Sequence, residues 1–261
     1  MTSPTEATGP STAQRAAPPW RRVRSQGAFE TRLILRNGEQ LLVLLILPAL
    51  ALVALARLSM IDLDVEGARR IDFVTPGILA LAVMSTAFTS QAITTSFDRR
   101  NGVLRLLATT PLGRGGLLAG KVLAVLAVEV VQVVILGSVA LALGWAPPVA
   151  GIGPALAAIG LGTAAFTSLA LLIAGVLRSE AVLAVANLLL VLLAVAGGAL
   201  VPAAQLPGAL ADVAPLLPSG ALGEALRGAL LDGGLPVGPA LVLVAWTVAL
   251  GWGAARYFRW S

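Results

Sequence analysis

The chain has 261 residues, of which 57% are hydrophobic and 12% are charged, and its mean hydropathy is +0.91. Soluble domains carry about 25% charged residues, so this composition indicates a polytopic membrane protein. The formal net charge of +5 is explained by basic cytoplasmic loops, and we expect no nucleic-acid partner. Because the sequence contains no Cys and no His, it excludes disulfides, thiolate or imidazole catalysis and His-containing metal sites, and we predict no metal site.

The N-terminal segment, residues 1–26, is predicted to be a disordered cytoplasmic tail. It is rich in Thr, Ser, Ala and Pro as far as Pro19 and has little that could form a core. It contains no apolar run long enough for a signal peptide. We assign residues 27–261 to a single membrane domain.

Six apolar stretches approach or exceed the length that a membrane-spanning helix needs, about 20 residues. They predict an all-α polytopic membrane protein with spans near residues 40–57, 74–96, 117–144, 152–177, 182–201 and 237–256. With six spans, 14 of the 18 Lys and Arg residues lie on the side that holds both termini. Since basic loops stay in the cytoplasm, we expect a multi-pass plasma-membrane protein with both termini cytoplasmic.

The most basic segment between two apolar stretches is residues 97–121. Asp98 is predicted to cap a short amphipathic helix, with Leu104 and Leu107 on its apolar side and Pro111 at its end. The residues alone leave two interpretations open. The helix could lie at the membrane surface with its arginines on anionic lipid, or it could present its apolar side to a soluble partner.

A few polar side chains fall inside the predicted spans. Glu129 and Gln132, one turn apart in the third span, would either line a translocation path or contact a neighbouring helix or protomer through hydrogen bonds. The second span is rich in Thr and Ser and also carries Phe88 and Gln91. Hydroxyls of this kind usually serve helix packing, but pore lining stays open. We assign Phe88, Gln91, Glu129 and Gln132 to a candidate translocation path.

The segment after the fifth span is too interrupted by Pro and Gly for a membrane span and too apolar for a solvated loop. It predicts two short amphipathic helices at the outer leaflet. Leu206 and Leu210 lie on the apolar side of the first, and Leu222 and Leu226 on that of the second. Irregular backbone at membrane depth is tolerated only against protein or water.

Three stretches of the sequence resemble the family of ABC-2 type transport permeases. They are Phe97-Asp98-Arg99-Arg100-Asn101-Gly102-Val103-Leu104-Arg105-Leu106-Leu107-Ala108-Thr109-Thr110-Pro111 with Gly120-Lys121; Leu35-Arg36-Asn37 ahead of Pro48; and Leu206-Pro207 with Ala225-Leu226-Arg227. The likeness covers about residues 28–258. It is nearest to the drug-resistance exporters of the daunorubicin type.

The resemblance implies a six-helix permease that pairs with a second copy and binds two copies of a separate ATP-binding subunit. ATP and Mg²⁺ would be bound by that subunit, with no cofactor on this chain, which lacks the phosphate-binding pattern Gly-x-x-x-x-Gly-Lys-[Ser/Thr]. The docking point would be a coupling helix of residues 98–110. Its residues would be Asp98, Arg99, Arg100, Gly102, Leu104, Leu107 and Pro111, and Leu104→Asp is expected to abolish transport.

Residues 27–37 would form the family's interfacial connecting helix. Here Leu33, Ile34 and Leu35 spread around most of a helical wheel, which predicts poor amphipathicity.

The predicted function is the membrane subunit of an exporter, not an enzyme, that moves an apolar or amphipathic substrate such as a drug, a lipid or a secondary metabolite. An ion-coupled secondary transporter, with Glu129 carrying a proton, is the alternative. A polytopic membrane enzyme would need paired carboxylates, a Ser–base pair or a metal cluster, and the sequence offers none of these. Dependence on ATP would separate the first two functions.

Overall fold

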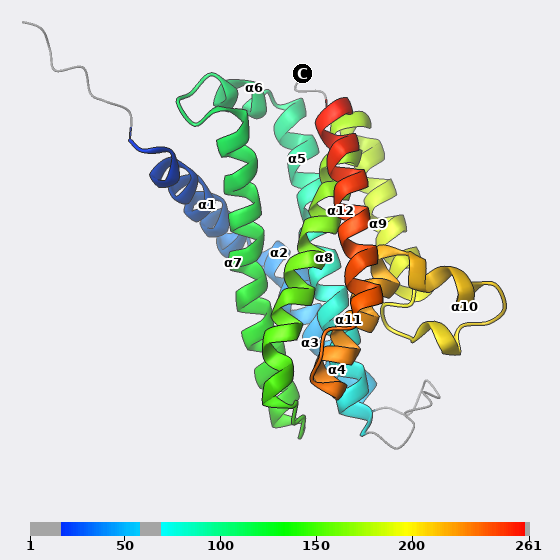
Figure 1. Ribbon diagram of the computed structural model, residues 1–261. Coiled ribbons are helices and arrows are strands. Elements are labelled where there is room, and N and C mark those ends of the chain that lie inside the picture. The colour runs from blue at the N-terminus through cyan, green and yellow to red at the C-terminus, as the bar shows by residue number, and fades with distance from the viewer. Residues whose placement is uncertain (1–16, 58–68, 259–261) are drawn as a thin grey trace, which may run out of the picture.

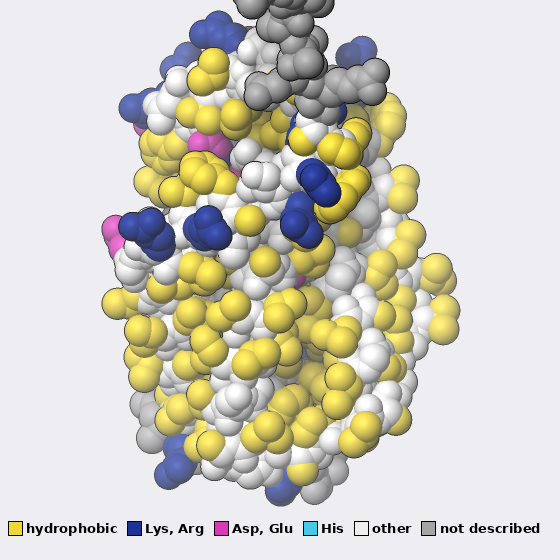
Figure 2. All heavy atoms as spheres, turned by 90° about the vertical axis from the view of Figure 1, so that its left-hand side faces the viewer, with side chains coloured by type: hydrophobic (Ala, Val, Ile, Leu, Met, Phe, Trp, Pro, Cys, Tyr) yellow, Lys and Arg dark blue, Asp and Glu magenta, His cyan; other side chains and the backbone are white. Residues whose placement is uncertain are grey.

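The computed structural model describes residues 17–57 and 69–258. Over these residues the chain is helical and contains no strand, which confirms the all-α prediction (Figure 1). Figure 2 shows apolar side chains over most of one face of the bundle, while Lys and Arg gather towards one end and along the opposite edge. An apolar belt between charged ends is typical of a protein that spans a bilayer.

Within the described residues, five helical segments are long and apolar enough to cross a membrane. The first joins α2 (Gly38–Leu41), the π-helical η1 (Leu42–Ile46) and α3 (Leu47–Arg57), and the second joins α4 (Arg70–Val83), the π-helical η2 (Met84–Ser90) and α5 (Gln91–Arg100). The others are α7 (Gly113–Ala142), α8 (Val149–Val176) and α12 (Val237–Tyr257). The segment α4–η2–α5 is by far the most buried of the five, so it forms the centre of the bundle.

The predicted fifth span is shorter than expected. It corresponds to α9 (Ser179–Val195), whereas the prediction extended to residue 201. The backbone leaves the helix at Gly197 and Gly198, and Gly198 has a φ of +79°, which favours glycine. Two successive glycines after an apolar run are a helix C-terminal signal that hydropathy alone does not detect.

The two predicted outer-leaflet helices have different outcomes. The first is wrong: between 203 and 216 the chain forms η3 (Ala203–Gln205), a single turn α10 (Leu210–Val213) and η4 (Ala214–Leu216), with Leu206 outside any helix. Proline and the left-handed Gly208 prevent a longer helix here.

The second predicted helix is present as α11 (Pro218–Asp232), while its place at the outer leaflet stays a prediction. Leu222 and Leu226 are fully buried, because α11 packs against α8, α4 and α12 rather than lying on the surface. Helix α11 is therefore part of the interior of the bundle.

The N-terminal helix α1 (Pro19–Arg36) begins inside the segment predicted to be disordered, so that the predicted tail extends too far by eight residues, 19–26. Pro19 suits the first helical position, where no N–H is needed. Gly27, Glu30 and Ile34 are buried against α7 on one side of the helix. The prediction of poor amphipathicity is wrong, because it considered only residues near the C-terminal end of this helix. Residues 1–16 of the predicted tail lie outside the described residues.

Candidate functional site

The basic segment forms a hairpin between α5 and α7 at one end of the bundle, the same end as the last turn of α12 (Figure 1). Helix α5 continues to Arg100, the chain turns at Gly102 with a φ of +74°, and α6 (Val103–Ala108) follows. The predicted single helix over 98–110 is therefore two helices joined by a left-handed glycine turn.

Asp98 does not cap α6, contrary to the prediction. It lies in the last turn of α5, and its Oδ2 is 2.7 Å from Nζ of Lys121, which lies about two turns into α7. The basic partner is 23 residues further along the chain, so local capping patterns could not identify it. The carboxylate stabilises a contact between two membrane helices instead of a helix terminus.

The short helix α6 has one buried and one exposed apolar side. Leu104 is only 1% exposed and packs inside this chain, whereas Leu106 is 69% exposed and Val103 is 37% exposed. The prediction that Leu104 faces a partner is therefore wrong, and Leu104→Asp would damage the fold itself. Leu107 is half-buried. Sequence periodicity identified an apolar side but missed Leu106, which lies on the free side.

The end of α6 is fixed by hydrogen bonds that satisfy its last carbonyls. The hydroxyls of Thr109 and Thr110 donate to the carbonyl oxygens of Leu106 and Leu107, at 2.8 and 2.6 Å. Pro111 follows, as predicted, and its carbonyl accepts a hydrogen bond from Arg22 of α1. Helix α1 is thus attached to the hairpin that carries α6.

Arginines surround a recess of about 370 Å³ beside α6. Arg99, Arg100, Arg105 and Arg178 line it with Glu180. Arg100 Nη1 lies 2.5 Å from Glu180 Oε1, and Arg99 donates to the Leu177 carbonyl. The backbone N–H of Glu180 in the first turn of α9, helped by Arg100, lowers the pKa of its carboxyl group. The recess keeps an excess of positive charge.

Lys121 occupies the centre of a buried ionic cluster that joins α1, α5 and α7. Its side chain is 3% exposed, and its Nζ lies 3.3 Å from Glu30 Oε2 and 2.7 Å from Asp98 Oδ2. Gln26 donates to the second oxygen of Glu30 at 2.8 Å. The role of Glu30 was not predictable from the sequence, because nothing local marks a partner 91 residues away.

The candidate path residues on α7 connect to different neighbours. Glu129 Oε2 accepts a hydrogen bond of 2.6 Å from Thr163 of α8. Gln132 accepts one of 2.9 Å from Thr86 and donates one of 2.8 Å to the Leu44 carbonyl, and so joins α7 to both π-helical segments. These are the helix-packing bonds expected under the second interpretation, while a role in a path stays a prediction.

The other two candidate path residues, Phe88 and Gln91, lie in different surroundings from each other. Phe88 is completely buried, with its ring centroid 6.4 Å from that of Phe166. Gln91 is 3% exposed, and within the described part of the chain its Oε1 has no hydrogen-bond partner. Gln91 lines a cavity with Asp98 and Lys121, which Phe88, Glu129 and Gln132 do not reach.

The fold and this hairpin define a polytopic all-α membrane protein whose longest buried segment ends at a surface-exposed helical hairpin. The family model of the ABC-2 type transporter matches residues 25–231, most of the chain and nearly all of the described bundle except α12. The protein belongs to the ABC-2 type transporter family, and is thus a membrane transport subunit of the ABC exporter class. A comparison with curated proteins found no match.

Proposed function

We propose that this chain is the membrane subunit of an ATP-driven exporter and that α6 is the helix on which a separate ATP-binding subunit docks. The observation that carries this proposal is the exposed apolar side of α6. Leu106 stands clear of the chain at the tip of a hairpin, with the partly exposed Val103 and several arginines beside it. Burying a leucine at an interface contributes about 1.5–3 kcal/mol, so Leu106 is a suitable anchor.

The hairpin is connected so that a movement of α6 would reach several helices. The Gly102 turn leads directly into α5, the buried contacts of Lys121 join α5 to α7 and α1, and Arg22 ties α1 to Pro111. Closure of the ATP-binding subunits on ATP would therefore reposition the second and third membrane spans. The path would lie between this chain and a second copy of it.

The remaining features of the proposal follow from family membership and charge. Two copies of the ATP-binding subunit, which hold the ATP and Mg²⁺, would serve a permease dimer in the plasma membrane, with α6 and both termini in the cytoplasm. The apolar interior supports an apolar or amphipathic substrate, as in the drug-resistance exporters of the daunorubicin type.

Photo-crosslinking tests the docking proposal directly. Because the chain has no Cys, Leu106→Cys creates a single thiol that a maleimide–benzophenone reagent can label. We expect this variant, in membranes that contain the ATP-binding subunit, to crosslink to that subunit. Leu216→Cys is the matched control, because Leu216 is 63% exposed but lies on η4, whose main contacts are with α10, α11 and α12 rather than with α6. Equal crosslinking of both, or none at Leu106, would refute the proposal.

A further inference from the structure

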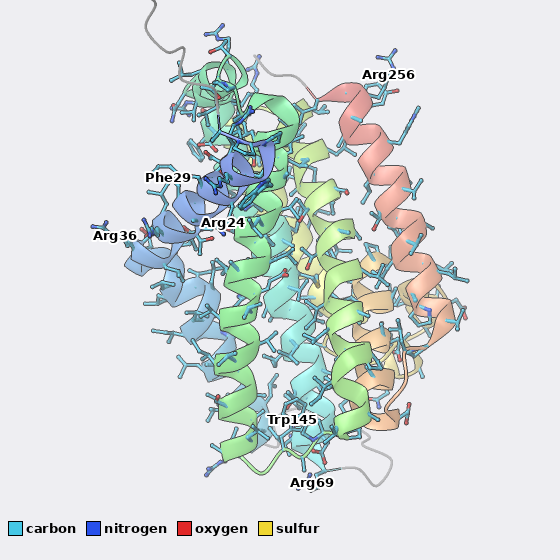
Figure 3. All side chains as sticks on the ribbon, turned by 60° about the vertical axis from the view of Figure 1, so that its left-hand side comes forward. Arg24, Phe29, Arg36, Arg69, Trp145 and Arg256 are labelled. Carbon is cyan, nitrogen blue, oxygen red and sulfur yellow. The ribbon has the colours of Figure 1, made fainter. Side chains whose placement is uncertain are left out.

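A cavity of about 580 Å³ lies among α1, α2, α5, α6 and α7, next to the ionic cluster. Its lining includes Phe29 and Phe97, the ion-paired Glu30, Asp98 and Lys121, and Gln91. Figure 3 marks Phe29 on α1, towards the end of the bundle that carries the hairpin. Sites for small organic ligands have volumes of about 300–1,000 Å³ and combine apolar walls with a few polar groups.

The charges on the cavity wall do not cancel. Two carboxylates, those of Glu30 and Asp98, share the single ammonium group of Lys121. Among the described residues no arginine lines this cavity, and Arg21 and Arg22 line the neighbouring recess, which shares Gln26 and Phe29 with it. The cavity thus carries an excess of one negative charge, at a depth where water screens it less than at the surface.

Gln91 supplies a second, independent sign of a ligand. Its side chain is almost entirely buried, and its Oε1 accepts no hydrogen bond from any described residue. A buried acceptor that is left unsatisfied is unfavourable, so a ligand that donates a hydrogen bond here would bind more tightly. The ring of Phe29 adds a wall that attracts a cation as well as an apolar body. The ring of Phe97, which already has the Arg100 guanidinium 5.6 Å from its centroid, adds an apolar wall.

We propose that this cavity binds an organic cation, a protonated amine on an apolar or aromatic body. The amine N–H donates to Gln91 Oε1, the excess carboxylate charge balances the cation, and the body packs between the two phenylalanines. Such an amine belongs either to a free amphiphile or to the headgroup of a phosphatidylethanolamine. The inference rests on the proposed function only where it makes the free amphiphile a transported substrate.

The test uses rhodamine 123, a cation, and rhodamine 110, its net-neutral parent acid with the same N–H donors. Fluorescence anisotropy is measured on the full chain in nanodiscs of phosphatidylcholine, whose trimethylammonium headgroup has no N–H. We expect rhodamine 123 to bind about tenfold more tightly than rhodamine 110. Equal affinities for the two dyes, or no binding of the cation in either lipid arm described below, would overturn the proposal.

Two isosteric variants change the charge of the cavity in opposite directions. Glu30→Gln removes the excess carboxylate and leaves Lys121 paired with Asp98, so we expect about tenfold weaker binding of rhodamine 123. Gln91→Glu adds a carboxylate, and we expect it to bind rhodamine 123 more tightly. Damage to the fold would weaken binding, so it could not produce this result. Glu39→Gln, an exposed acid outside the cavity, is the control and should change nothing. If both cavity variants bind like the parent chain, the proposal fails.

A second arm of the experiment identifies the source of the amine. Nanodiscs that contain phosphatidylethanolamine should displace the dye if a lipid headgroup is the resident ligand, and should leave it bound if the ligand is a free amphiphile. Either result supports the cation site. The assay contains no ATP and no ATP-binding subunit, so its failure would leave docking through α6 intact, and loss of crosslinking at Leu106 would leave the cation site intact.

Discussion

Lys121 Nζ lies 2.7 Å from Asp98 Oδ2, so that the first turns of α7 are joined to the last turn of α5 directly beside the hairpin that carries α6. The lysine side chain is 3% exposed and also contacts Glu30 of α1. A buried charge without its partner is strongly unfavourable, so the three helices are held in one arrangement at this end of the bundle.

Lys121→Met tests the contribution of this cluster to stability. It leaves Glu30 and Asp98 facing each other without a cation, and we expect the free energy of unfolding to fall by about 3–5 kcal/mol. The measurement is the unfolding midpoint in detergent, followed by tryptophan fluorescence. Arg100→Met is the control, because the side chains of Arg100 and Glu180 are 54% and 70% exposed and their pair should contribute less than about 1 kcal/mol. Similar midpoints for the two variants would contradict a stabilising cluster.

Arg227 of α11 is predicted to hold the irregular chain after α9 in place. Its guanidinium donates to the carbonyls of Gly198 and Ala199 at 2.9 and 3.1 Å, and pairs with Glu224. A lysine has one compact ammonium group and cannot reproduce this fork, so Arg227→Lys should cost about 1–3 kcal/mol.

Limited proteolysis between α9 and α11 is the measurement for Arg227→Lys, and we expect faster cleavage than in the parent chain. Arg178→Lys, an exposed arginine at the start of α9, is the control and should be cleaved at the parent rate. Resistance of Arg227→Lys equal to that of the parent would show that the fork is dispensable.

Gly151 of α8 is predicted to be required for the close packing of α11. A Cβ at this position would overlap the backbone oxygen of Ala229, which cannot rotate away as a side chain can. We expect Gly151→Ala to lower the free energy of unfolding by about 1–3 kcal/mol, as overpacking usually does.

Gly153, two residues further along the same helix, provides the comparison. Nothing lies within 4 Å of a Cβ there, so Gly153→Ala should stabilise the helix by up to about 1 kcal/mol. The measurement is the unfolding midpoint of each alanine variant, and we expect a lower midpoint for Gly151→Ala than for Gly153→Ala. Equal midpoints would mean that α8 and α11 can separate without loss.

The membrane spans were predictable because hydrophobic length is a local property of the chain. The basic segment 97–121 was correctly expected to connect the second and third spans, although it forms two helices where one was predicted. What the sequence did not specify is the direction each side chain faces. Helix α6 is so short that its periodicity allows more than one burial pattern, and only the packing against α5 and α7 shows that Leu104 is covered and Leu106 is free.

Long-range polar contacts explain most of the other differences. Asp98 looked like a helix cap because its partner Lys121 lies 23 residues away on the next span, and nothing local marks the backbone carbonyls that Arg227 binds. Single-sequence patterns describe neighbours along one helix, whereas these side chains satisfy groups on other helices. Contacts with another helix also explain the wrong prediction for α1. Its buried side is formed in part by Gly27 and Glu30, which a search for leucines does not detect.

ATP hydrolysis by the purified complex of this chain with its ATP-binding subunit is the most direct measurement of coupling through α6. If α6 carries the coupling, Leu106→Asp should lower the hydrolysis that depends on this chain at least about tenfold, because a carboxylate cannot be buried in an apolar contact. Leu216→Asp, equally exposed on η4, should hydrolyse ATP at the parent rate. Parent-like hydrolysis by Leu106→Asp, in a complex that still assembles, would contradict docking through α6.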